Sequence, residues 1–426
     1  MIQKTCFLDS LNKDKCYGCE ACAQICPSQS ISMEEDEEGF RYPRINENTC
    51  VHCGLCRSVC PFNISFVGES PVKYAYGGYI LDKLIRFNST SGGAFTAIAR
   101  AYCDKDYVIF GAASNGIEVF HSFVTSIEDL DKFRKSKYSQ SRIGDSYKQV
   151  KLFLKEGKKV LFSGTPCQIA GLKSFLNNAN QDSLLTIEVV CEGVPSPLYV
   201  RKMKEKLEKK YEASLESIDY RYKGKSIFGK GKWDFQQQEV IMKNEKIIRK
   251  GFARNENVTI IHKTIRKDRW FNPFWSIWLQ HLMTRPSCYE CKFAQKKRNA
   301  DITLGDLWGV HIYCPDLYGE NGGSSLVVCN TKKGKKMLEK AKSSMFGREL
   351  KYEEVLKYQS PLKKHIDYNP NRELFMSDLK SNYNYEEINK KWAKKPTLRL
   401  LWQKYVWGNR QKVALWRLFH KKERIQ

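Results

Sequence analysis

The sequence has no apolar run that approaches the length of a membrane span. Its N-terminal stretch, Met1–Asp9, lacks the apolar segment of a secretory signal peptide. It has no low-complexity region, and no recognisable nucleic-acid-binding module accompanies its basic charge. With these segments missing, we expect a cytoplasmic protein, and nucleic acid is not among its predicted partners.

Cysteine, in contrast, is abundant, with 16 residues in a chain of 426. Eight of them form two copies of a C-x-x-C-x-x-C-x-x-x-C-P motif, at residues 16–27 and 50–61. In bacterial two-cluster ferredoxins with this spacing, the fourth cysteine of each motif ligates the other cluster. We therefore assign one [4Fe–4S] cluster to Cys16, Cys19, Cys22 and Cys60, and the second to Cys50, Cys53, Cys56 and Cys26. Zinc or a disulfide framework fits this doubled run less well, because zinc sites use four ligands in CxxC pairs.

Charge is unevenly distributed along the chain. Residues 1–70 carry 6 basic against 10 acidic residues, a net charge of −4, whereas the whole chain has a net charge of +25. An acidic cluster domain is therefore joined to a strongly basic body. The basic charge suits an anionic cofactor, an acidic protein partner or a membrane surface, and it is equally compatible with a solvated surface that has no specific partner.

Two buried strands are each predicted to deliver a cysteine at their carboxyl end. The strand Lys158–Phe162 leads into Cys167, which lies in the first turn of a helix that runs to Leu176. The strand Leu185–Val190 leads directly into Cys191. Open α/β sheets keep their binding sites at the carboxyl ends of strands, so both cysteines are candidates for one site.

A third cysteine pair, Cys288 and Cys291, has the C-x-x-C spacing of a metal site. Together with Cys167 and Cys191 it gives four thiolates, which is the ligand count of an iron–sulfur cluster and also of structural zinc. Incidental cysteines are the remaining interpretation. The other four cysteines have no such spacing and are expected to be ordinary buried thiols: Cys6, Cys103, Cys314 and Cys329.

Five motifs in this order resemble the beta-subunit family of deazaflavin (coenzyme F420) hydrogenases and dehydrogenases. They are residues 89–93 (STSGG), 164–173 (GTPCQIAGLK), 191–196 (CEGVPS), 288–293 (CYECKF) and 301–309 (DITLGDLWG). The resemblance covers residues 1 to about 330, since some members carry a similar N-terminal ferredoxin domain. Bacterial members of the family include proteins encoded among polysaccharide-synthesis genes.

The resemblance implies cofactors and site residues beyond the two N-terminal clusters. It implies that Cys167, Cys191, Cys288 and Cys291 hold a third [4Fe–4S] cluster beside an FAD. It implies flavin contacts from two segments, namely Ser91, Gly92 and Gly93 in the first and Lys137 and Ser141 in the second. Asp306, expected with Gly305 on the turn after the strand Asp301–Leu304, is placed near this site without an assigned role.

The C-terminal residues 391–426 hold 11 basic residues against a single acidic one. Leu398, Leu401, Trp402 and Tyr405 fall at helical spacing, with basic residues on the other faces. This pattern is typical of an amphipathic helix at a membrane interface or on an acidic partner, and also of a helix packed on the protein's own body.

Taken together, the sequence predicts an α+β protein in three parts. These are a ferredoxin-like domain (1–70), a mixed α/β flavin- and cluster-binding domain (72–330) and a basic, mainly helical extension (331–426). The predicted function is an iron–sulfur flavoprotein oxidoreductase that exchanges electrons between a ferredoxin-like donor and a small organic substrate or a deazaflavin-type coenzyme. The alternative is a non-catalytic electron-transfer subunit of a larger redox complex, tied to cell-surface polysaccharide synthesis. A third interpretation is an interaction protein with structural clusters.

Overall fold

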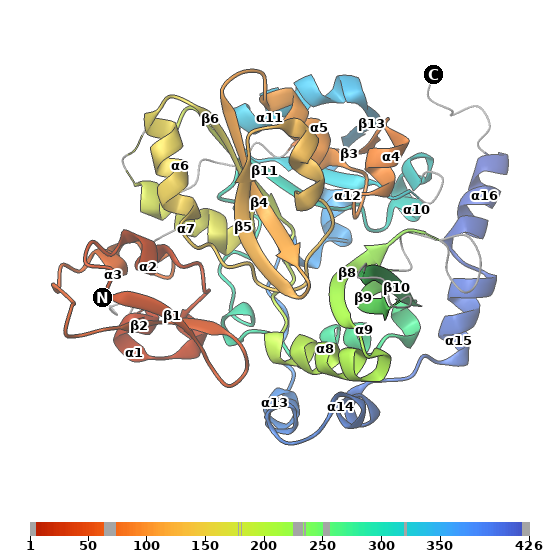
Figure 1. Cartoon of the computed structure of the whole chain (residues 1–426). Helices are drawn as coiled ribbons and strands as arrows, with labels where there is room; N and C mark the ends of the chain where they lie inside the picture. Colours follow the sequence, from red (N-terminus) through yellow and green to blue (C-terminus); the bar gives the residue numbers. More distant parts are fainter. Residues whose placement is uncertain are drawn as a thin grey trace.

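A small N-terminal domain packs beside a larger α/β body, and helices run along the far edge (Figure 1). The predicted α+β class is therefore confirmed. The predicted boundary near residue 71 lies outside the described residues. The computed structural model describes residues 6–63, 74–177, 179, 181–224, 233, 236–249, 256–318 and 322–419.

The N-terminal domain wraps its two cysteine motifs around a short hairpin. Its elements are α1 (Phe7–Ser10), α2 (Ala21–Ile25), β1 (Ile31–Glu35), β2 (Arg41–Ile45) and α3 (Leu55–Ser58). The strands β1 and β2 pair antiparallel, with Ile31 opposite Ile45. One short helix lies within each motif, so each run of cysteines is presented by the same local structure.

The body is built on a mixed sheet of eight strands. In spatial order these are β13 (Met345–Leu350), β3 (Tyr74–Ile80), β12 (Ser325–Cys329), β11 (Ile302–Asp306), β7 (Leu184–Val189), β6 (Lys159–Gly164), β4 (Tyr107–Asn115) and β5 (Glu118–Val124). Strands β11, β7, β6 and β4 are parallel, and antiparallel strands flank them on both sides. Since β13 pairs with β3, the sheet extends past residue 330 into the segment predicted as a separate extension.

Helices cover both faces of this sheet. Neighbouring residues of β4 are buried on opposite faces of the sheet. Ile109 packs in the core beneath α5 (Ala94–Tyr102) and α11 (Lys332–Ala341), whereas Val108 packs on the opposite face. That opposite face is covered by α6 (Ser146–Lys155) and α7 (Pro166–Leu176). Burial on both faces accounts for the nearly continuous apolar runs of the central strands.

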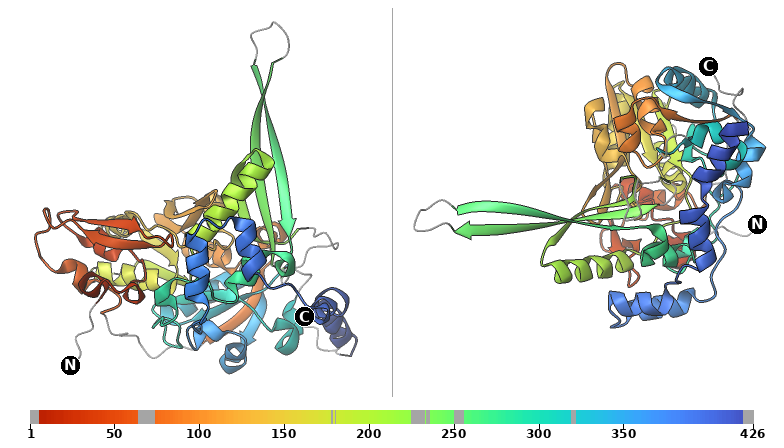
Figure 2. Two further views of the ribbon diagram at one scale, coloured as in Figure 1. Left: turned by 90° about the horizontal axis from the view of Figure 1, so that it is seen from below. Right: turned by 90° about the vertical axis from the view of Figure 1, so that its right-hand side faces the viewer.

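A second sheet projects from the body. Its order is β10 (Glu256–Lys267), β9 (Gln237–Arg249) and β8 (Ser214–Tyr222), all antiparallel. The strands β9 and β10 form a long arm that extends away from the rest of the molecule (Figure 2). At its base, α8 (Pro197–Tyr211) and α9 (Pro273–Trp278) pack in one core with Trp275 and Trp278 buried, so the aromatic segment 270–281 is largely core.

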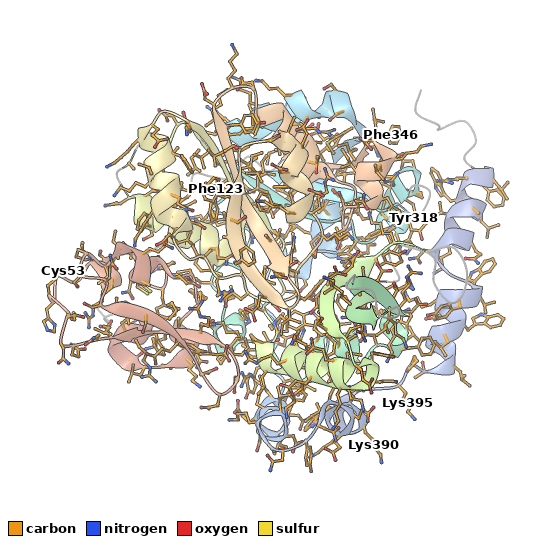
Figure 3. All side chains as sticks on the ribbon, in the orientation of Figure 1. Cys53, Phe123, Tyr318, Phe346, Lys390 and Lys395 are labelled. Carbon is orange, nitrogen blue, oxygen red and sulfur yellow. The ribbon has the colours of Figure 1, made fainter. Side chains whose placement is uncertain are left out.

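The remaining helices are spread around the molecule, and the last two run along one edge (Figure 1). They are α4 (Lys83–Phe87), α10 (Val310–Tyr313), α12 (Tyr352–Lys357), α13 (Arg372–Lys380), α14 (Tyr385–Trp392), α15 (Leu398–Leu401) and α16 (Asn409–Phe419), with a π-helical turn at Trp402–Val406. Exposed lysines of the C-terminal region, among them Lys390 and Lys395, lie on its lower side (Figure 3). Among the described residues, no helix combines the length and the apolar character needed to cross a bilayer.

Polar contacts fix the N-terminal domain to the body. Glu38 forms a buried ion pair with Arg372 of α13 at 2.6 Å, and its backbone carbonyl accepts a hydrogen bond from Ser196. On another side, the Gln24 side chain accepts a hydrogen bond from the backbone N–H of Tyr147 at the start of α6. These contacts hold the cysteine motifs in one orientation relative to α7.

Candidate iron–sulfur site

The fourth cysteine of the second N-terminal motif lies close to the first motif. Burial raises the pKa of Cys22, and the neighbouring Cys19 thiol raises it further. Cys60 of the second motif lies beside Cys6, which raises the pKa of Cys60, and Cys19 is also close enough to contribute to that rise. Cys60 therefore lies beside the first motif.

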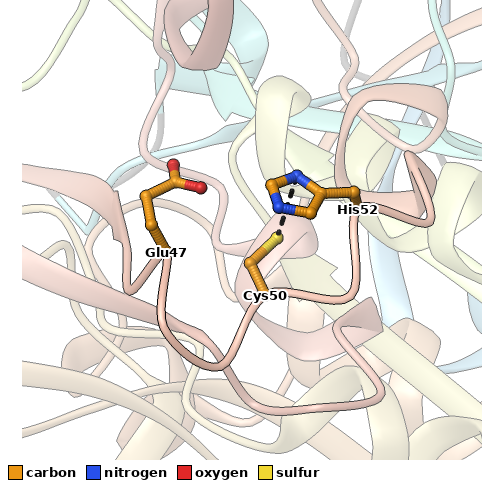
Figure 4. A group of neighbouring side chains, drawn as sticks. All are labelled: Glu47, Cys50 and His52. Atoms are coloured by element: carbon orange, nitrogen blue, oxygen red, sulfur yellow. Dashed lines mark hydrogen bonds between the residues drawn. The ribbon is translucent and has the colours of Figure 1, made fainter.

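The second motif lies at the protein surface. Cys53 is exposed at the outer edge of the domain (Figure 3). Cys50 has two further candidate ligands beside it, Glu47 and His52, and the ligand atoms of the three lie within 4.8 Å of one another (Figure 4). No sequence motif singles out His52. Its Nδ1 lies 4.0 Å from Cys50 Sγ, so it adds a titratable group to the exposed edge of the motif.

Cys167 is positioned by the start of α7. Thr165 caps this helix in a capping box with Gln168, and Pro166 occupies the first turn. The Thr165 hydroxyl lies 3.2 Å from Cys167 Sγ. The strand-to-helix turn predicted from the sequence therefore presents the Cys167 thiol at the carboxyl end of β6.

The structure brings all four of the remaining predicted ligands to one pocket. Cys167, Cys191, Cys288 and Cys291 line it, with Tyr17 of the N-terminal domain. Burial and, to a smaller extent, the Cys291 thiol raise the pKa of Cys167 to about 11. The residues of this set thus interact with one another although they come from three separate segments.

Gly193 allows two of these segments to approach closely. Its φ of +104° is in the region that favours glycine, and a β-carbon there would lie 2.8 Å from Thr284 and 3.3 Å from Cys288. An isolated bridge between Pro195 and Thr284 joins the same segments. The glycine in the C-x-G motif therefore has a packing role that brings Cys191 next to Cys288.

The pocket lies directly beside the first N-terminal motif. A β-carbon on Gly171, one helical turn after Cys167, would lie only 3.0 Å from Cys19 Sγ. Tyr17 bridges the two sets, because its ring packs edge-to-face against Phe293 at 4.9 Å. Figure 1 shows the corresponding contact between α7 and the helices of the N-terminal domain. The first motif and the four-cysteine pocket are therefore immediate neighbours.

The first predicted flavin segment is held by bonds within the protein. The Ser91 hydroxyl donates to the Ser324 carbonyl, and the Gly92 N–H donates to the Ser325 hydroxyl. A β-carbon on Gly92 would lie 2.4 Å from the Gly78 carbonyl, so this glycine is required by strand packing. Gly93 has a φ of +83° and precedes α5. The packing of this loop is sufficient to explain its sequence.

The second predicted flavin segment is also tied to the protein. The Lys137 ammonium donates to the carbonyls of Lys132 and Arg134, and burial lowers the pKa of Lys137 to about 7. The Ser141 hydroxyl accepts a hydrogen bond from Gln168, which caps the helix of Cys167. Ser141 therefore helps to hold the first turn of the helix that carries Cys167.

A buried arginine–aspartate pair was missed by sequence reasoning. Arg221 of β8 donates to Asp306 at 2.8 Å, and Asp306 is the last residue of β11 and not part of a turn after it. Within the described part of the chain, Nε and Nη2 of Arg221 and Oδ1 of Asp306 are buried without a hydrogen-bond partner. Arg221 lies in a Lys-rich stretch with no motif, so only the Asp306 side of this pair carried a sequence signal.

Other charged groups lie near this pair. Desolvation raises the pKa of Glu192, which follows Cys191, while the nearby Arg269 lowers it. Arg269 is also close to the arginine of the pair. Lys223 donates three hydrogen bonds of 2.6 to 2.7 Å to backbone carbonyls, one of them that of Ser91. Burial and neighbouring cations, among them the arginine of the pair, lower the pKa of Lys223. The pair therefore has charged neighbours beside Cys191 and beside the Ser91 loop.

Comparison with known proteins agrees with this arrangement. Residues 157–352 match the family model that describes the C terminus of the coenzyme F420 hydrogenase/dehydrogenase beta subunit, and residues 15–64 match that of a 4Fe-4S dicluster domain. The chain carries the C-terminal domain of the F420 hydrogenase/dehydrogenase beta subunits. The predicted family resemblance is confirmed over these residues, and the dicluster match supports iron–sulfur clusters in the N-terminal domain.

The search of solved structures gives a more distant likeness. A chain from a xenon-derivatized F420-reducing [NiFe] hydrogenase complex of Methanosarcina barkeri shares 17% sequence identity at a TM-score of 0.40. The alignment covers 76% of this chain and 93% of that chain. No curated protein matches the sequence.

Proposed function

We propose that this protein is an iron–sulfur flavoprotein oxidoreductase in which three [4Fe–4S] clusters connect an electron donor with FAD. The observation that carries the proposal is the contact between Cys19 and Gly171, which places the N-terminal motifs against the four-cysteine pocket. Electrons would enter at the exposed second motif and pass through the first motif to the pocket. Flow in the opposite direction uses the same path.

The spacing of the pocket thiols supports a cluster over zinc. With Zn–S bonds of about 2.3 Å, the sulfurs of a tetrahedral zinc site lie about 3.8 Å apart. Within the part of the chain that the structure describes, Glu47, Cys50 and His52 form the one group of three candidate ligands within 4.8 Å of one another. No three of the thiols of Cys167, Cys191, Cys288 and Cys291 lie that close together, which suits a cluster larger than a single ion.

The buried groups between the pocket and the Ser91 loop suit an anionic cofactor such as FAD. Arg221 and Arg269 have buried N–H groups without a partner among the described residues. We propose that these two arginines hold FAD together with Ser91, Gly92, Gly93, Lys137 and Ser141. FAD, when bound, supplies two-electron chemistry next to one-electron clusters. The protein's own task is to position it and to exclude water from the pocket.

The substrate in this proposal is a small organic molecule or a deazaflavin-type coenzyme, and the donor is a ferredoxin-like protein. The test is an anaerobic purification in which iron, acid-labile sulfide and released flavin are measured per chain. About 12 iron and one FAD would support three clusters that feed a flavin. About 8 iron without flavin would overturn both the third cluster and the flavin.

A second candidate function is an electron-transfer subunit without its own substrate. The arm formed by β9 and β10 favours it, because a two-stranded ribbon that projects into solvent is only marginally stable alone (Figure 2). This alternative predicts bound clusters but no turnover until a partner subunit is added. Turnover of the purified chain with a reduced ferredoxin and a screened acceptor would contradict it.

We also propose that the C-terminal region contacts a membrane surface. Leu398 is 86% exposed and Phe419 81% exposed, although Val413 between them is buried against the body. Exposed Leu, Trp and Phe side chains next to basic residues are typical of interfacial binding to anionic lipid. Co-sedimentation with vesicles that contain anionic lipid should fall when Leu398 and Trp402 are both changed to Ser. Equal binding by the double variant, or equal binding to neutral vesicles, would argue against this contact.

A further inference from the structure

Arg285 lies at the junction between the two sets of cysteines. It is 1% exposed and precedes Cys288 by three residues. Its Nε donates to the Cys16 carbonyl at 2.9 Å, and its Nη2 donates to the Arg41 carbonyl at 3.0 Å. One guanidinium thus joins the segment that carries Cys288 to the loop that carries Cys16.

The fit around this guanidinium is close on every side. Its Nη1 donates to Gln140 Oε1 at 3.2 Å, and its Cζ lies 4.4 Å from the centre of the Tyr42 ring. A β-carbon on Gly18, which has a φ of +63°, would lie 3.0 Å from Nη1. Gly18 is part of the first C-x-x-C spacing, so the ferredoxin motif itself leaves room for the arginine.

Arg285 differs from the other buried arginines in its partners. Arg298 pairs with Glu188, Arg221 with Asp306 and Arg372 with Glu38. The hydrogen bonds of Arg285 within the described residues all go to neutral oxygens. A buried charge without a counter-charge is strongly unfavourable. A negative group other than a carboxylate is therefore required nearby.

The cysteine ligands are the negative groups within reach. Arg285 Nε bonds to the backbone of Cys16, and Cys288 follows Arg285 by three residues, so a predicted ligand of each inner cluster lies beside the guanidinium. A [4Fe–4S] cluster with four thiolate ligands carries net negative charge, which increases by one on reduction. A fixed cation beside such a cluster favours the reduced form and raises its reduction potential.

We propose that Arg285 is a positioning residue. It raises the reduction potentials of both the first N-terminal cluster and the pocket cluster, and it fixes the positions of the two clusters relative to each other. This inference rests on the proposed function, because it requires the pocket cluster. The second N-terminal cluster lies at the exposed end of the domain and does not share the cation. The arginine therefore keeps the two inner clusters matched to each other for electron transfer.

The test is a redox titration of the whole protein, followed by electron paramagnetic resonance, for three variants. Arg285→Met removes the cation, Arg285→Lys retains it, and Arg201→Met removes a partly exposed interface arginine that pairs with Glu35 of the N-terminal domain. We expect Arg285→Met to lower the reduced-to-oxidised ratio of both inner clusters at least tenfold at fixed potential, a shift of about 59 mV for one electron. Arg285→Lys should restore most of this ratio, and Arg201→Met should leave it unchanged.

Several results would overturn the inference. Unchanged reduction potentials in an Arg285→Met protein with full iron content would do so. An equal shift of all three cluster potentials in Arg285→Met, or the same shift in Arg201→Met, would also do so. If Arg285→Met does not fold, Gln140→Glu places a carboxylate beside the guanidinium and should lower the same two potentials. Iron content of the unaltered protein tests the proposed function separately, since about 8 iron would remove the pocket cluster whatever the potentials show.

Discussion

The N-terminal cysteines and the pocket cysteines are assembled in opposite ways. Eight N-terminal ligands come from 45 consecutive positions, and short helices and one hairpin present them. The pocket cysteines come from three segments that are separated by up to about a hundred residues and meet only when β6, β7 and β11 pair. The first set depends on local spacing, whereas the second depends on the complete sheet.

The outer edge of the second N-terminal motif and the pocket also differ in their exposure to solvent. Cys53 is exposed, whereas burial raises the pKa of Cys191 to about 12. An exposed cluster can exchange electrons with a separate protein, and a buried one is better placed to serve a bound cofactor. In the proposed function, the difference in construction corresponds to a difference in task, with electron entry at the surface and delivery inside.

Removing one predicted ligand from each set should give the largest difference in iron content and flavin reduction between two variants. Cys53→Ala should lose the outer cluster, about 4 iron, and keep the remaining clusters, because these are assigned to other cysteines. Cys167→Ala should lose the pocket cluster and flavin reduction while both N-terminal clusters remain. Iron content, together with flavin reduction by dithionite and by reduced ferredoxin, measures both effects.

The two variants would refute the comparison if they behaved alike. Cys53→Ala should still allow dithionite to reduce the flavin, since dithionite does not need the outer cluster, but reduced ferredoxin should act slowly. Full iron content in Cys167→Ala would show that this residue is not a ligand. Cys103→Ala, at a buried cysteine outside all the motifs, is the matched control and should change neither readout.

The same contrast between local spacing and long-range assembly decides which site residues could be predicted from the sequence. The doubled motif specifies its ligands by spacing alone, so all eight N-terminal cysteines could be named in advance. Cys167 and Cys191 could be named because each follows a strand with a recognisable exit. Arg221 and Arg285 could not, because their roles arise from pairs 85 and 269 positions apart in the sequence, to Asp306 and to Cys16.

The C-terminal part was the least predictable region. Charge and helical spacing indicated helices there, but they did not reveal that β13 adds a strand to the main sheet beside β3. A strand of six residues on a sheet edge has little periodicity of its own, and its pairing is decided by the exposed edge of β3. The anchoring of Glu38 by Arg372 has the same long-range character.

Breaking the ion pair that anchors the N-terminal domain to the body should have the second largest effect, a loss of stability. Arg372→Met leaves Glu38 buried without its partner, which should cost about 3–5 kcal/mol of stability. Arg201→Met, at a pair with Glu35 that is about a third exposed, should cost about 1 kcal/mol or less. Urea unfolding followed by cluster absorbance measures both values. Equal costs would show that the buried pair does not anchor the N-terminal domain.

Gly171 offers the smallest and most specific test, because it is the point where the two sets touch. A side chain there meets Cys19 Sγ at 3.0 Å and the Tyr147 hydroxyl at 3.1 Å, so Gly171→Val should overpack the contact and cost about 1–3 kcal/mol. Electron transfer from the first cluster to the pocket should slow, and Gly171→Ala should show a smaller effect in the same direction.

Gly334→Ala is the control, because its β-carbon would meet the Asp301 carbonyl at 2.3 Å, away from α7. Stopped-flow reduction should therefore separate the two glycines, since both variants lose stability but only the one at Gly171 slows transfer between the clusters. If Gly334→Ala slowed transfer as much, the effect would come from general loosening of the body and not from the contact between the two sets.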